Sequence, residues 1–484
     1  MIRKRWTRGA ALLLALALLA AACGDSGGIG ESASTEGTTA TTEAATTTTA
    51  ADSGGTETTE APSTSEAMEA PTYDGVVDLG ADTSVDLSEC PEDWDPYGGI
   101  TDDEIRIGFT LPRSGSLAAF GGIADGARAY FDWINANDPV DGKKLVLIDK
   151  DDAYDSAQSI ANVEEFLGSE NVFAVSVLGS PNNLAVRPIL NEACVPQLYT
   201  LSGLPQFGDP QNWPWVIGGL LNYTTEAGIW CQNIVDELGE GATVAALFMN
   251  NDFGLAYRPA MEKCAADGLI DLVASEVHEP GAPDITSEMT TMAASGADAF
   301  VLGSTSKFCP QAMVAIDQSD WDPKIKFVSS TCSNLAAFFK PVDPAGVGIR
   351  VVSVAKNNTD PAFADDPAVQ QGVQILQDAG LDPFSGTAAL AFLYATIWVE
   401  AMRNAAEMPG GLNRVNFQTA MWNMDYEDPY YLDGSVLVSD GANDAYLVEA
   451  GRVDEYQLDA DGVGTLVPAS DLISVEGQLG HFQG

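Results

Sequence analysis

The residues best suited to binding chemistry form a short glycine- and serine-rich loop from Ser114 to Gly122, between a strand-like and a helix-like segment. Its glycines leave backbone N–H groups open to a ligand, and the positive end of the following helix favours an anion. A loop of this kind, at the carboxyl end of a strand, can bind a small anionic group. A turn without any ligand fits this stretch equally well, so the rest of the chain has to decide.

Motifs for catalysis are weak in this sequence. The segment Gly24–Gly28, GDSGG, matches the surroundings of a serine protease nucleophile, but it lies in a low-complexity region with no histidine upstream. We find no Ser/His/Asp arrangement, no phosphate-binding lysine loop and no metal-ligand spacing. The only histidines are His278 and His481. The sequence therefore predicts a protein that is not an enzyme and carries no cofactor and no metal.

The elements that hold the loop repeat along the chain. Apolar residues recur at every second position before it and at helical spacing after it: Ile105, Ile107, Phe109 and Leu111, then Ile123, Ala127, Tyr130, Phe131 and Ile134. Further strands are expected at 145–149, 172–178 and 197–200, with helices at 183–192 and from Asp155 or Ser156 to Leu167 between them. A second alternating series runs from Glu226 to Val328. This alternation predicts an α/β fold with parallel sheets covered by helices.

Later segments are expected to add a strand at 348–354, helices at 368–379 and 387–405, and a strand pair formed by 430–437 and 445–448. The apolar stretch 388–399 is too short to span a membrane and ends at Glu400. We therefore interpret it as a buried core helix.

Composition limits the classes of function. The chain has 484 residues, of which 45% are hydrophobic, so it can form two lobes around large cores. Its net charge of −48 excludes electrostatic binding of nucleic acid and argues against docking on anionic lipid by charge.

The N-terminus has the features of an export signal. Residues 1–23 combine basic residues, a short apolar run and small residues before Cys23, and LLAAAC resembles the lipobox of bacterial lipoproteins. We expect Cys23 to be lipidated and the protein to be anchored extracytoplasmically on the bacterial cell membrane. Residues 24–101 are expected to form a disordered Thr/Ser/Glu-rich tether, and the folded body begins near Asp102.

The remaining six cysteines suggest disulfides, because their number is even and the protein is predicted to be exported. Six cysteines allow 15 pairings. We favour three of these pairings: Cys309 with Cys332, Cys231 with Cys264, and Cys90 with Cys194. A metal cluster is the alternative, but the wide spacings and the scarcity of histidine disfavour it.

From Asp102 onward the pattern resembles the type I periplasmic binding proteins, and among them the branched-chain amino acid and amide binding branch of ABC transporters. The resemblance rests on LPRSGSLAAFGG, AVSVLGSPNNLAVRPILNEACVPQL, NNDFG and GADAFVLGS in this order. It implies two doubly wound parallel-sheet lobes joined by a three-segment hinge. Lobe 1 would comprise 102–221 and 356–428, lobe 2 would comprise 222–355 and 429–484, and the crossovers would lie near Gly218–Leu221, Val354–Asn357 and Asp425–Tyr430.

The resemblance also implies a ligand site between the lobes. Its carboxylate donors would be Ser180 and the loop Leu201, Ser202 and Gly203, with Ser114 at the border and Phe120 as a candidate wall. The second lobe would contribute Asn222, Tyr223, Phe253, Thr305 and Thr331 or Cys332. Phe253 stands where the family usually has tyrosine, so ring packing is kept and a phenolic hydrogen bond is lost.

An amino acid ligand also needs an acidic partner for its ammonium group. Thr331 stands near the position where the family has an acidic residue, which leaves Glu226 or Asp252 as candidates. The resemblance implies a solute-binding protein of an ABC importer, with an ABC permease as partner and a branched-chain amino acid as the favoured ligand. Open alternatives are an amide, urea-like or small organic acid ligand, and a sensor module that signals to a membrane partner.

Overall fold

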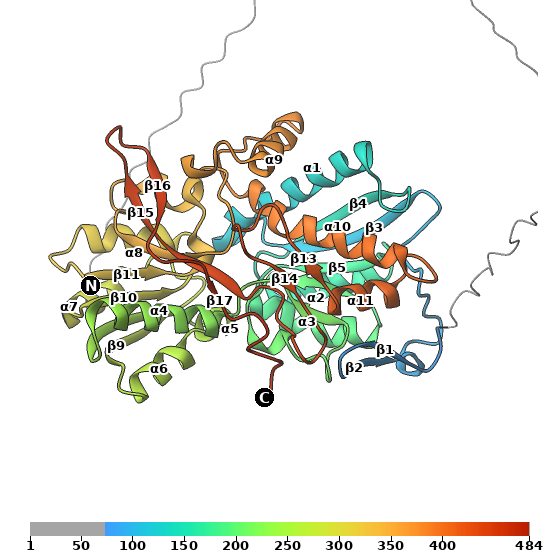
Figure 1. The fold of residues 1–484 in the computed structure, drawn as a ribbon, viewed down its shortest axis with the longest axis horizontal. Coiled ribbons are helices and arrows are strands. Elements are labelled where there is room, and N and C mark those ends of the chain that lie inside the picture. Colours follow the sequence, from blue (N-terminus) through green and yellow to red (C-terminus); the bar gives the residue numbers. More distant parts are fainter. Residues whose placement is uncertain (1–72, 484) are drawn as a thin grey trace, which may run out of the picture. The chain divides into compact units, whose positions relative to one another are not determined.

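The computed structural model describes residues 73–483, which form two halves, each built on its own sheet (Figure 1). The predicted export signal, Cys23 and the first part of the predicted tether lie outside the described residues. Within them, the predicted α/β class with two parallel-sheet lobes is confirmed.

The first half contains a five-stranded sheet in which every strand is parallel to its neighbours. Its order is β4-β3-β5-β6-β7, with β3 Glu104–Leu111, β4 Lys144–Asp151, β5 Ala174–Val177, β6 Gln197–Thr200 and β7 Val216–Gly218. Helices α1 Gly122–Asn137, α2 Ser156–Leu167 and α3 Ser180–Glu192 follow successive strands. The central strands β5 and β6 are buried along their whole length, as expected for a parallel sheet covered on both faces.

The start of α2 shows how local sequence positions these elements. The carboxylate of Asp155 accepts hydrogen bonds from the N–H groups of Ala157 and Gln158. Such a cap satisfies N–H groups that have no partner inside the helix. The predicted helix ending at Leu167 is therefore confirmed.

The second half contains a larger sheet of order β16-β15-β12-β11-β10-β8-β9, with β17 paired to β15. Its strands are β8 Ala242–Met249, β9 Ile270–His278, β10 Ala299–Gly303, β11 Ile325–Val328, β12 Ile349–Ser353, β15 Ala450–Leu458, β16 Gly464–Pro468 and β17 Ile473–Ser474. Strands β8 to β12 are parallel, and β15 adds an antiparallel edge. The helices are α4 Tyr223–Leu238, α5 Asp252–Leu255, α6 Arg258–Ala266, α7 Thr286–Ser295 and α8 Phe308–Asp317.

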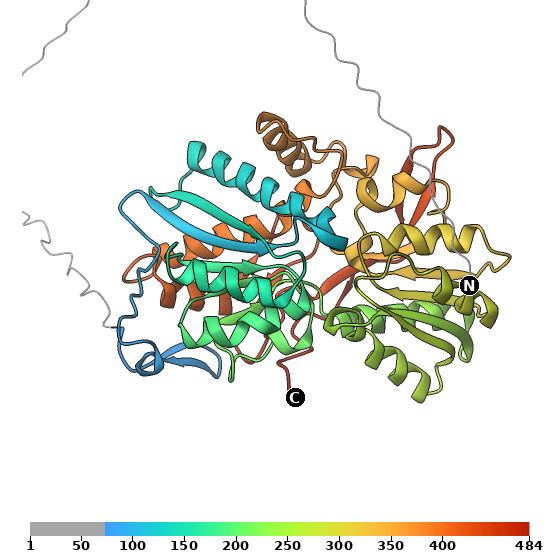
Figure 2. The ribbon, with the colours of Figure 1, turned by 180° about the vertical axis from the view of Figure 1, so that it is seen from behind.

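Three later helices are α9 Pro367–Asp378, α10 Phe392–Glu407 and α11 Arg414–Trp422, and α10 packs on the first sheet. Figure 2 shows α10 running beside the first sheet. The indole of Trp398 meets the ring of Phe109 edge-on, with ring centroids 5.7 Å apart. Trp398 and its neighbours are fully buried, so the prediction of a core helix here is confirmed. Among the helices of residues 73–483, none has the length and hydropathy that crossing a bilayer requires.

The prediction that the disordered tether continues to residue 101 is wrong for residues 73–101. They contain the antiparallel hairpin β1 Val76–Gly80 and β2 Thr83–Asp86, and Asn423 after α11 donates a side-chain hydrogen bond to Leu79 O of β1. A disulfide between Cys90 and Cys194 fastens this segment to the first half. These non-local contacts hold the segment, and Leu79, Val85 and Leu87 are buried in the core.

The expected strand pair 430–437 and 445–448 is also wrong. The long antiparallel pair near the end is β15 with β16, while Leu437–Val438 (β14) pairs with Asp425–Tyr426 (β13). Part of the segment expected in lobe 2 contacts the first half, because Tyr446 bridges to Gly218 and its hydroxyl donates to Pro205 O at 3.0 Å.

Two of the expected crossovers run side by side. Ala355 bridges to Tyr431, and the N–H of Lys356 donates to Tyr430 O at 2.8 Å. Leu432 N donates in turn to Val354 O at 3.1 Å. The two segments therefore form a narrow, hydrogen-bonded connection between the two halves of the protein.

Candidate functional site

A cavity of about 150 Å³ lies where the carboxyl ends of the two parallel sheets face each other. The first half contributes Tyr154 after β4, and Ser180 at the start of α3 after β5. The second half contributes Phe253 after β8 and Thr305 after β10. The carboxyl edge is the usual place for ligands in α/β sheets, since the loops there are free to diverge.

Seven of the eleven predicted ligand-binding residues line this cavity: Phe120, Ser180, Leu201, Tyr223, Phe253, Thr305 and Thr331. They come from both halves of the molecule and are separated by up to two hundred residues in the chain. The fold therefore brings most of the predicted ligand-binding residues together around one cavity.

The other four predicted residues do not line the cavity. Ser114 is exposed, and its N–H donates to Asp151 Oδ1 at 3.2 Å. Asn222 caps α4 by accepting from the N–H of Thr224 at 2.9 Å. Gly203 lies against the Tyr223 ring, and Ser202 is buried with its hydroxyl 2.7 Å from that of Ser180.

Hydroxyl groups gather where α3 begins. The oxygens Ser180 Oγ and Ser202 Oγ are 2.7 Å apart, and the phenol of Tyr223 lies close to both. Burial raises the pKa of the Tyr223 phenol, while hydrogen bonds with Gly203 N–H and the two serine hydroxyls oppose this shift. This cluster sits at the positive end of a helix dipole without any full charge among its members.

The backbone conformation immediately before α3 requires a glycine at position 179. Its φ is 103°, a value that L-residues rarely adopt, and an added Cβ would come within 2.3 Å of the Tyr154 ring. The glycine thus lets Tyr154 close the cavity directly over the start of α3.

Three buried hydroxyl groups on the cavity wall have no hydrogen-bond partner among residues 73–483. They belong to Thr305, Ser353 and Tyr430. Buried polar atoms are nearly always paired in folded proteins, so orphaned ones call for an explanation. Their position makes them available to a polar group inside the cavity.

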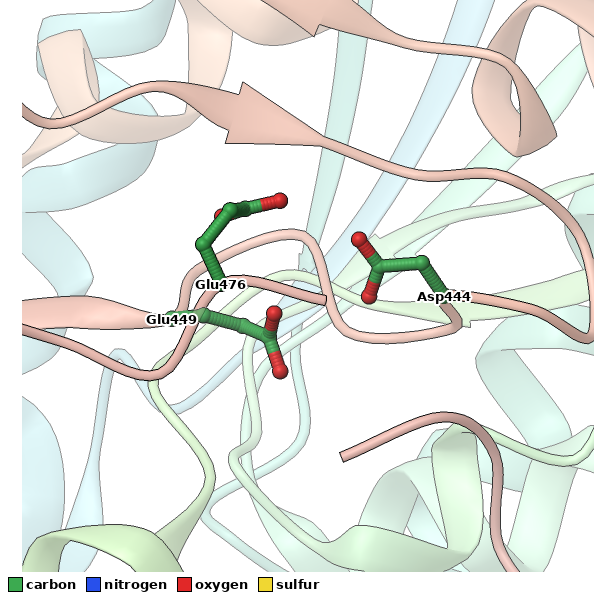
Figure 3. Close-up of side chains that lie close together, drawn as sticks. All are labelled: Asp444, Glu449 and Glu476. Atoms are coloured by element: carbon green, nitrogen blue, oxygen red, sulfur yellow. The ribbon is translucent and has the colours of Figure 1, made fainter. Parts of the chain in front are cut away.

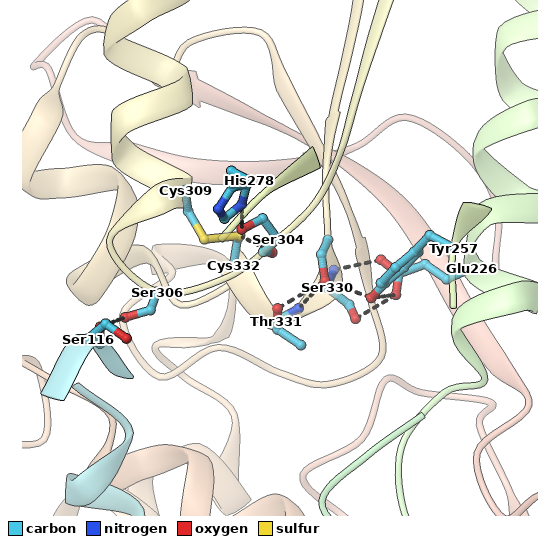
Figure 4. The surroundings of a disulfide bond; sticks show 11 residues. Ser116, Glu226, Tyr257, His278, Ser304, Ser306, Cys309, Ser330, Thr331 and Cys332 are labelled. Carbon is cyan, nitrogen blue, oxygen red and sulfur yellow. Dashed lines mark hydrogen bonds between the residues drawn. A yellow bond between two sulfur atoms is a disulfide. The ribbon is translucent and has the colours of Figure 1, made fainter. Parts of the chain in front are cut away.

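The charged groups nearest the cavity are already paired. Glu226 is 0% exposed, and its carboxylate accepts from Ser330 N at 2.6 Å, Ser330 Oγ at 2.8 Å and Tyr257 OH at 3.1 Å (Figure 4). Burial raises the pKa of Glu226 to about 7, and these hydrogen bonds oppose the shift. Ser330 lines the cavity, whereas Glu226 lies behind it.

The remaining charged candidates do not offer a free charge to the cavity. Asp252 is exposed in the first turn of α5. Lys356 is the one charged residue among the described cavity-lining residues, and its ammonium pairs with Asp366 at 2.8 Å and Asp433 at 3.0 Å. Among the described residues, no carboxylate side chain lines the cavity.

All three favoured disulfide pairings are present: Cys90–Cys194, Cys231–Cys264 and Cys309–Cys332. The last one ties the start of α8 to the turn that carries Ser330 and Thr331 (Figure 4). It therefore fixes a piece of the cavity wall, while Cys231–Cys264 joins α4 to α6 away from it.

Contacts across the cleft keep the two halves together. Ser306 Oγ donates to Ser116 O at 3.1 Å (Figure 4), and Asn334 Nδ2 donates to Gly386 O at 3.0 Å. The rings of Phe120 and Phe338 pack with centroids 6.2 Å apart. The described conformation is thus one in which the site is covered.

Several wall residues were not predicted from the sequence, among them Tyr154, Tyr394, Asn334, Ser353 and Tyr430. Tyr154 follows the predicted strand ending at Asp149, so its position at a strand end was a usable signal. Ser353 ends β12, so it too lies at the end of a predicted strand, whereas Tyr430 belongs to a crossover segment, where no local pattern marks a residue that faces a ligand.

Comparison with known proteins gives a consistent picture. A family model described as periplasmic binding protein matches residues 104–450. The Leu/Ile/Val-binding protein homolog 2 of Brucella abortus is 23% identical over 329 residues, which is 67% of this chain and 84% of that protein.

Two solved structures share the fold at low sequence identity. One is a fatty acid ABC transporter substrate-binding protein from Thermomonospora curvata, with a TM-score of 0.68, 17% identity and coverage of 79% of this chain and 97% of that chain. The other is a branched chain amino acid ABC transporter protein from Thermus thermophilus with bound valine, with a TM-score of 0.68, 17% identity and coverage of 78% and 97%.

Proposed function

Because this chain belongs to the periplasmic binding protein family, we propose that it is the extracytoplasmic solute-binding component of an ABC importer. Its ligand is a small carboxylate with a compact apolar body, and branched-chain amino acids come first among the candidates. The observation that carries this proposal is the covered cavity, with a hydroxyl cluster at one helix N-terminus and apolar side chains around the remaining space.

The carboxylate end of the ligand is assigned to Ser180 and the start of α3. A carboxylate needs several short donors, and hydroxyls beside a helix N-terminus supply them without a buried positive charge. The Tyr223 phenol lies close to the same two serines, so it can add a further donor to the carboxylate.

The apolar body is assigned to the space between Leu117, Phe120, Ile123 and Phe253. A cavity of about 150 Å³ suits a group about as large as a benzene ring. The branched side chains of valine, leucine and isoleucine are within this size.

An ammonium group would meet Ser330 and the orphaned hydroxyl of Thr305, with Glu226 behind Ser330. Both carboxylate oxygens of Glu226 are already hydrogen-bonded, so the cavity has, among the described residues, no free carboxylate that an ammonium group would need. The same wall therefore also supports a second ligand class, a small branched or aromatic acid without an ammonium group. The two related structures frame this choice, since one holds valine and the other belongs to a fatty acid transporter.

The location and partner also form part of the proposal. We assign diacylation to Cys23 and a tether to the residues that precede the folded body, with an ABC permease as the membrane partner. A Cys23→Ser variant should be released from the cell membrane. Cross-linking in cells should recover a permease, whereas recovery of a histidine kinase would favour a sensor.

A thermal-shift comparison of matched ligands tests the function. Valine and isovalerate share a branched body and a carboxylate, and they differ in the ammonium group. The unfolding midpoint of the full chain should rise with one of them by mass action. A rise with valine alone supports the amino acid, a rise with isovalerate alone supports the second class, and no rise across amino acids, amides and small acids would contradict the proposal.

A further inference from the structure

Three acidic side chains converge near the C-terminus, away from the cavity. Asp444 and Glu449 lie in the segment between β14 and β15, and Glu476 follows β17. Oxygen atoms of all three carboxylates lie within 4.8 Å of one another. Figure 3 shows the three side chains pointing toward a common point.

Burial separates this cluster from ordinary surface acids. Asp444 is 6% exposed and Glu449 is 1% exposed. Within the described residues, the oxygens Asp444 Oδ1, Glu449 Oε1 and Glu476 Oε1 have no hydrogen-bond partner. The second oxygen of Glu449 accepts from Gly477 N at 2.7 Å, so a backbone hydrogen bond holds this side chain in the cluster.

The negative charge here is not balanced by a basic residue in the described part of the chain. None of the ion pairs found there involves these three acids. The nearest further charges, Asp440 beside Asp444 and Asp425 beside Glu476, are also acidic. Burying unpaired carboxylates together is costly unless protons or a cation compensate them.

We propose that Asp444, Glu449 and Glu476 form a binding site for a hard divalent cation, Ca²⁺ in particular. The group offers only carboxylate oxygens, without imidazole nitrogen or thiolate sulfur, which is the ligand set that Ca²⁺ prefers. Three carboxylates supply up to about six oxygens, and water or backbone carbonyls complete the six to eight that Ca²⁺ takes.

A cation bound here would hold the C-terminal segment that contains Glu476 against the rest of the fold. Glu476 belongs to the tail, while Asp444 and Glu449 flank Tyr446, which bridges to Gly218 at the end of β7. A bound cation would therefore link the tail, the strand β15 that follows Glu449, and the edge of the first sheet. Its expected effect is on the stability of the fold, independently of ligand capture.

Two measurements on the full chain test this site. After treatment with a chelator, millimolar calcium chloride should raise the unfolding midpoint by roughly 2 to 4 °C, because a ligand that binds only the folded state stabilises it. Terbium should give luminescence sensitised by Tyr446, and calcium should displace it. The same measurement with magnesium chloride tests whether the site is selective for calcium.

The variant Glu449→Gln keeps the size of the side chain and an acceptor for Gly477 N–H, but it removes one charge. It should lose both the calcium shift and the terbium signal, whereas Asp461→Asn, at an exposed acid in the turn between β15 and β16, should keep both. A wild type that responds to neither calcium nor terbium would overturn the proposal. An undiminished response in Glu449→Gln would overturn it as well.

Discussion

The two walls of the cavity hold their polar groups in different ways. On the wall from the first sheet, Ser180 and Ser202 pair with each other beside the start of α3, and no described cavity-lining residue from β3 to β7 is charged. On the wall from the second sheet, Ser330 is backed by the buried carboxylate of Glu226. The first wall therefore suits an anionic group, and the second suits a donor group.

This difference also affects how rigid the walls are. The serine pair is positioned by a strand end and a helix start, which are parts of the regular fold. The turn with Ser330 and Thr331 is short, and the disulfide Cys309–Cys332 holds it in place. We expect changes on the second wall to alter stability, pH response and the preference for a ligand with an ammonium group, and changes on the first wall to alter affinity for the carboxylate.

The largest effect is expected from removing a disulfide. In the chain-entropy account, losing Cys90–Cys194, with its separation of 104 residues, costs about 5 kcal/mol of unfolding free energy, and losing Cys309–Cys332, with 23 residues, costs about 3 kcal/mol. Only the second loss should also weaken ligand binding. Chemical denaturation and calorimetry on the paired Cys→Ala variants measure the two effects, and equal ligand affinity in both variants would remove the positional role of Cys309–Cys332.

The next effect concerns pH. The pKa of Glu226 is raised by burial to about 7, so the folded protein favours its protonated form. The groups facing it are Ser330, Tyr257 and Tyr223. Its contribution to stability is complete below about pH 4.5 and is lost as the pH rises through about 7, by up to about 3 kcal/mol.

Glu226→Gln keeps the shape of the side chain and cannot ionise. Denaturation at several pH values should therefore show a smaller fall in stability between mildly acidic and mildly basic solution than in the wild type. Glu240→Gln, at an exposed position, is the control and should follow the wild type. Parallel curves for Glu226→Gln and the wild type would mean that Glu226 is charged in the folded protein throughout.

A smaller effect is expected for single hydroxyls on the first wall. Ser180→Ala should weaken binding of the carboxylate ligand by roughly 1 to 3 kcal/mol, because a buried acceptor would lose a donor. Ser114→Ala removes a hydroxyl of the same type at an exposed position outside the cavity and should leave affinity unchanged. Calorimetric titration of both variants compares them, and equal affinities would remove the assignment of Ser180.

The smallest effect is expected for Thr305 on the second wall. Thr305→Val removes a buried hydroxyl that has no partner among the described residues, so stability without ligand should stay equal or rise by about 1 kcal/mol. Affinity for a ligand with an ammonium group should fall, while affinity for an acid without one should not. A loss of affinity for both ligand types would mean that Thr305 acts through the shape of the wall.

The sequence predicted those features that depend on neighbouring residues. The repeated strand and helix patterns indicated the fold class, and Asp155 marked the start of α2 because a cap acts over three residues. Ser180 was identifiable because it follows a buried strand and opens a helix.

Features that depend on distant contacts were missed. The hairpin β1–β2 is short, and a disulfide to Cys194 and contacts after α11 hold its segment. Tyr430 reaches the cavity from a crossover segment without a local pattern. The carboxylates of Asp444, Glu449 and Glu476 follow no metal-binding spacing, because only the folded tail brings them together.

The most direct test of the central claim is a crystal structure of the full chain with the tightest ligand of the matched series. We predict that the ligand occupies the cavity with a carboxylate oxygen about 2.6 to 3.2 Å from Ser180 Oγ. The apolar body should lie between Phe120 and Phe253, and the opposite end should face Ser330. A carboxylate that faces Ser330 or Thr331 instead, or a ligand bound outside the cavity, would contradict the division of roles between the two walls.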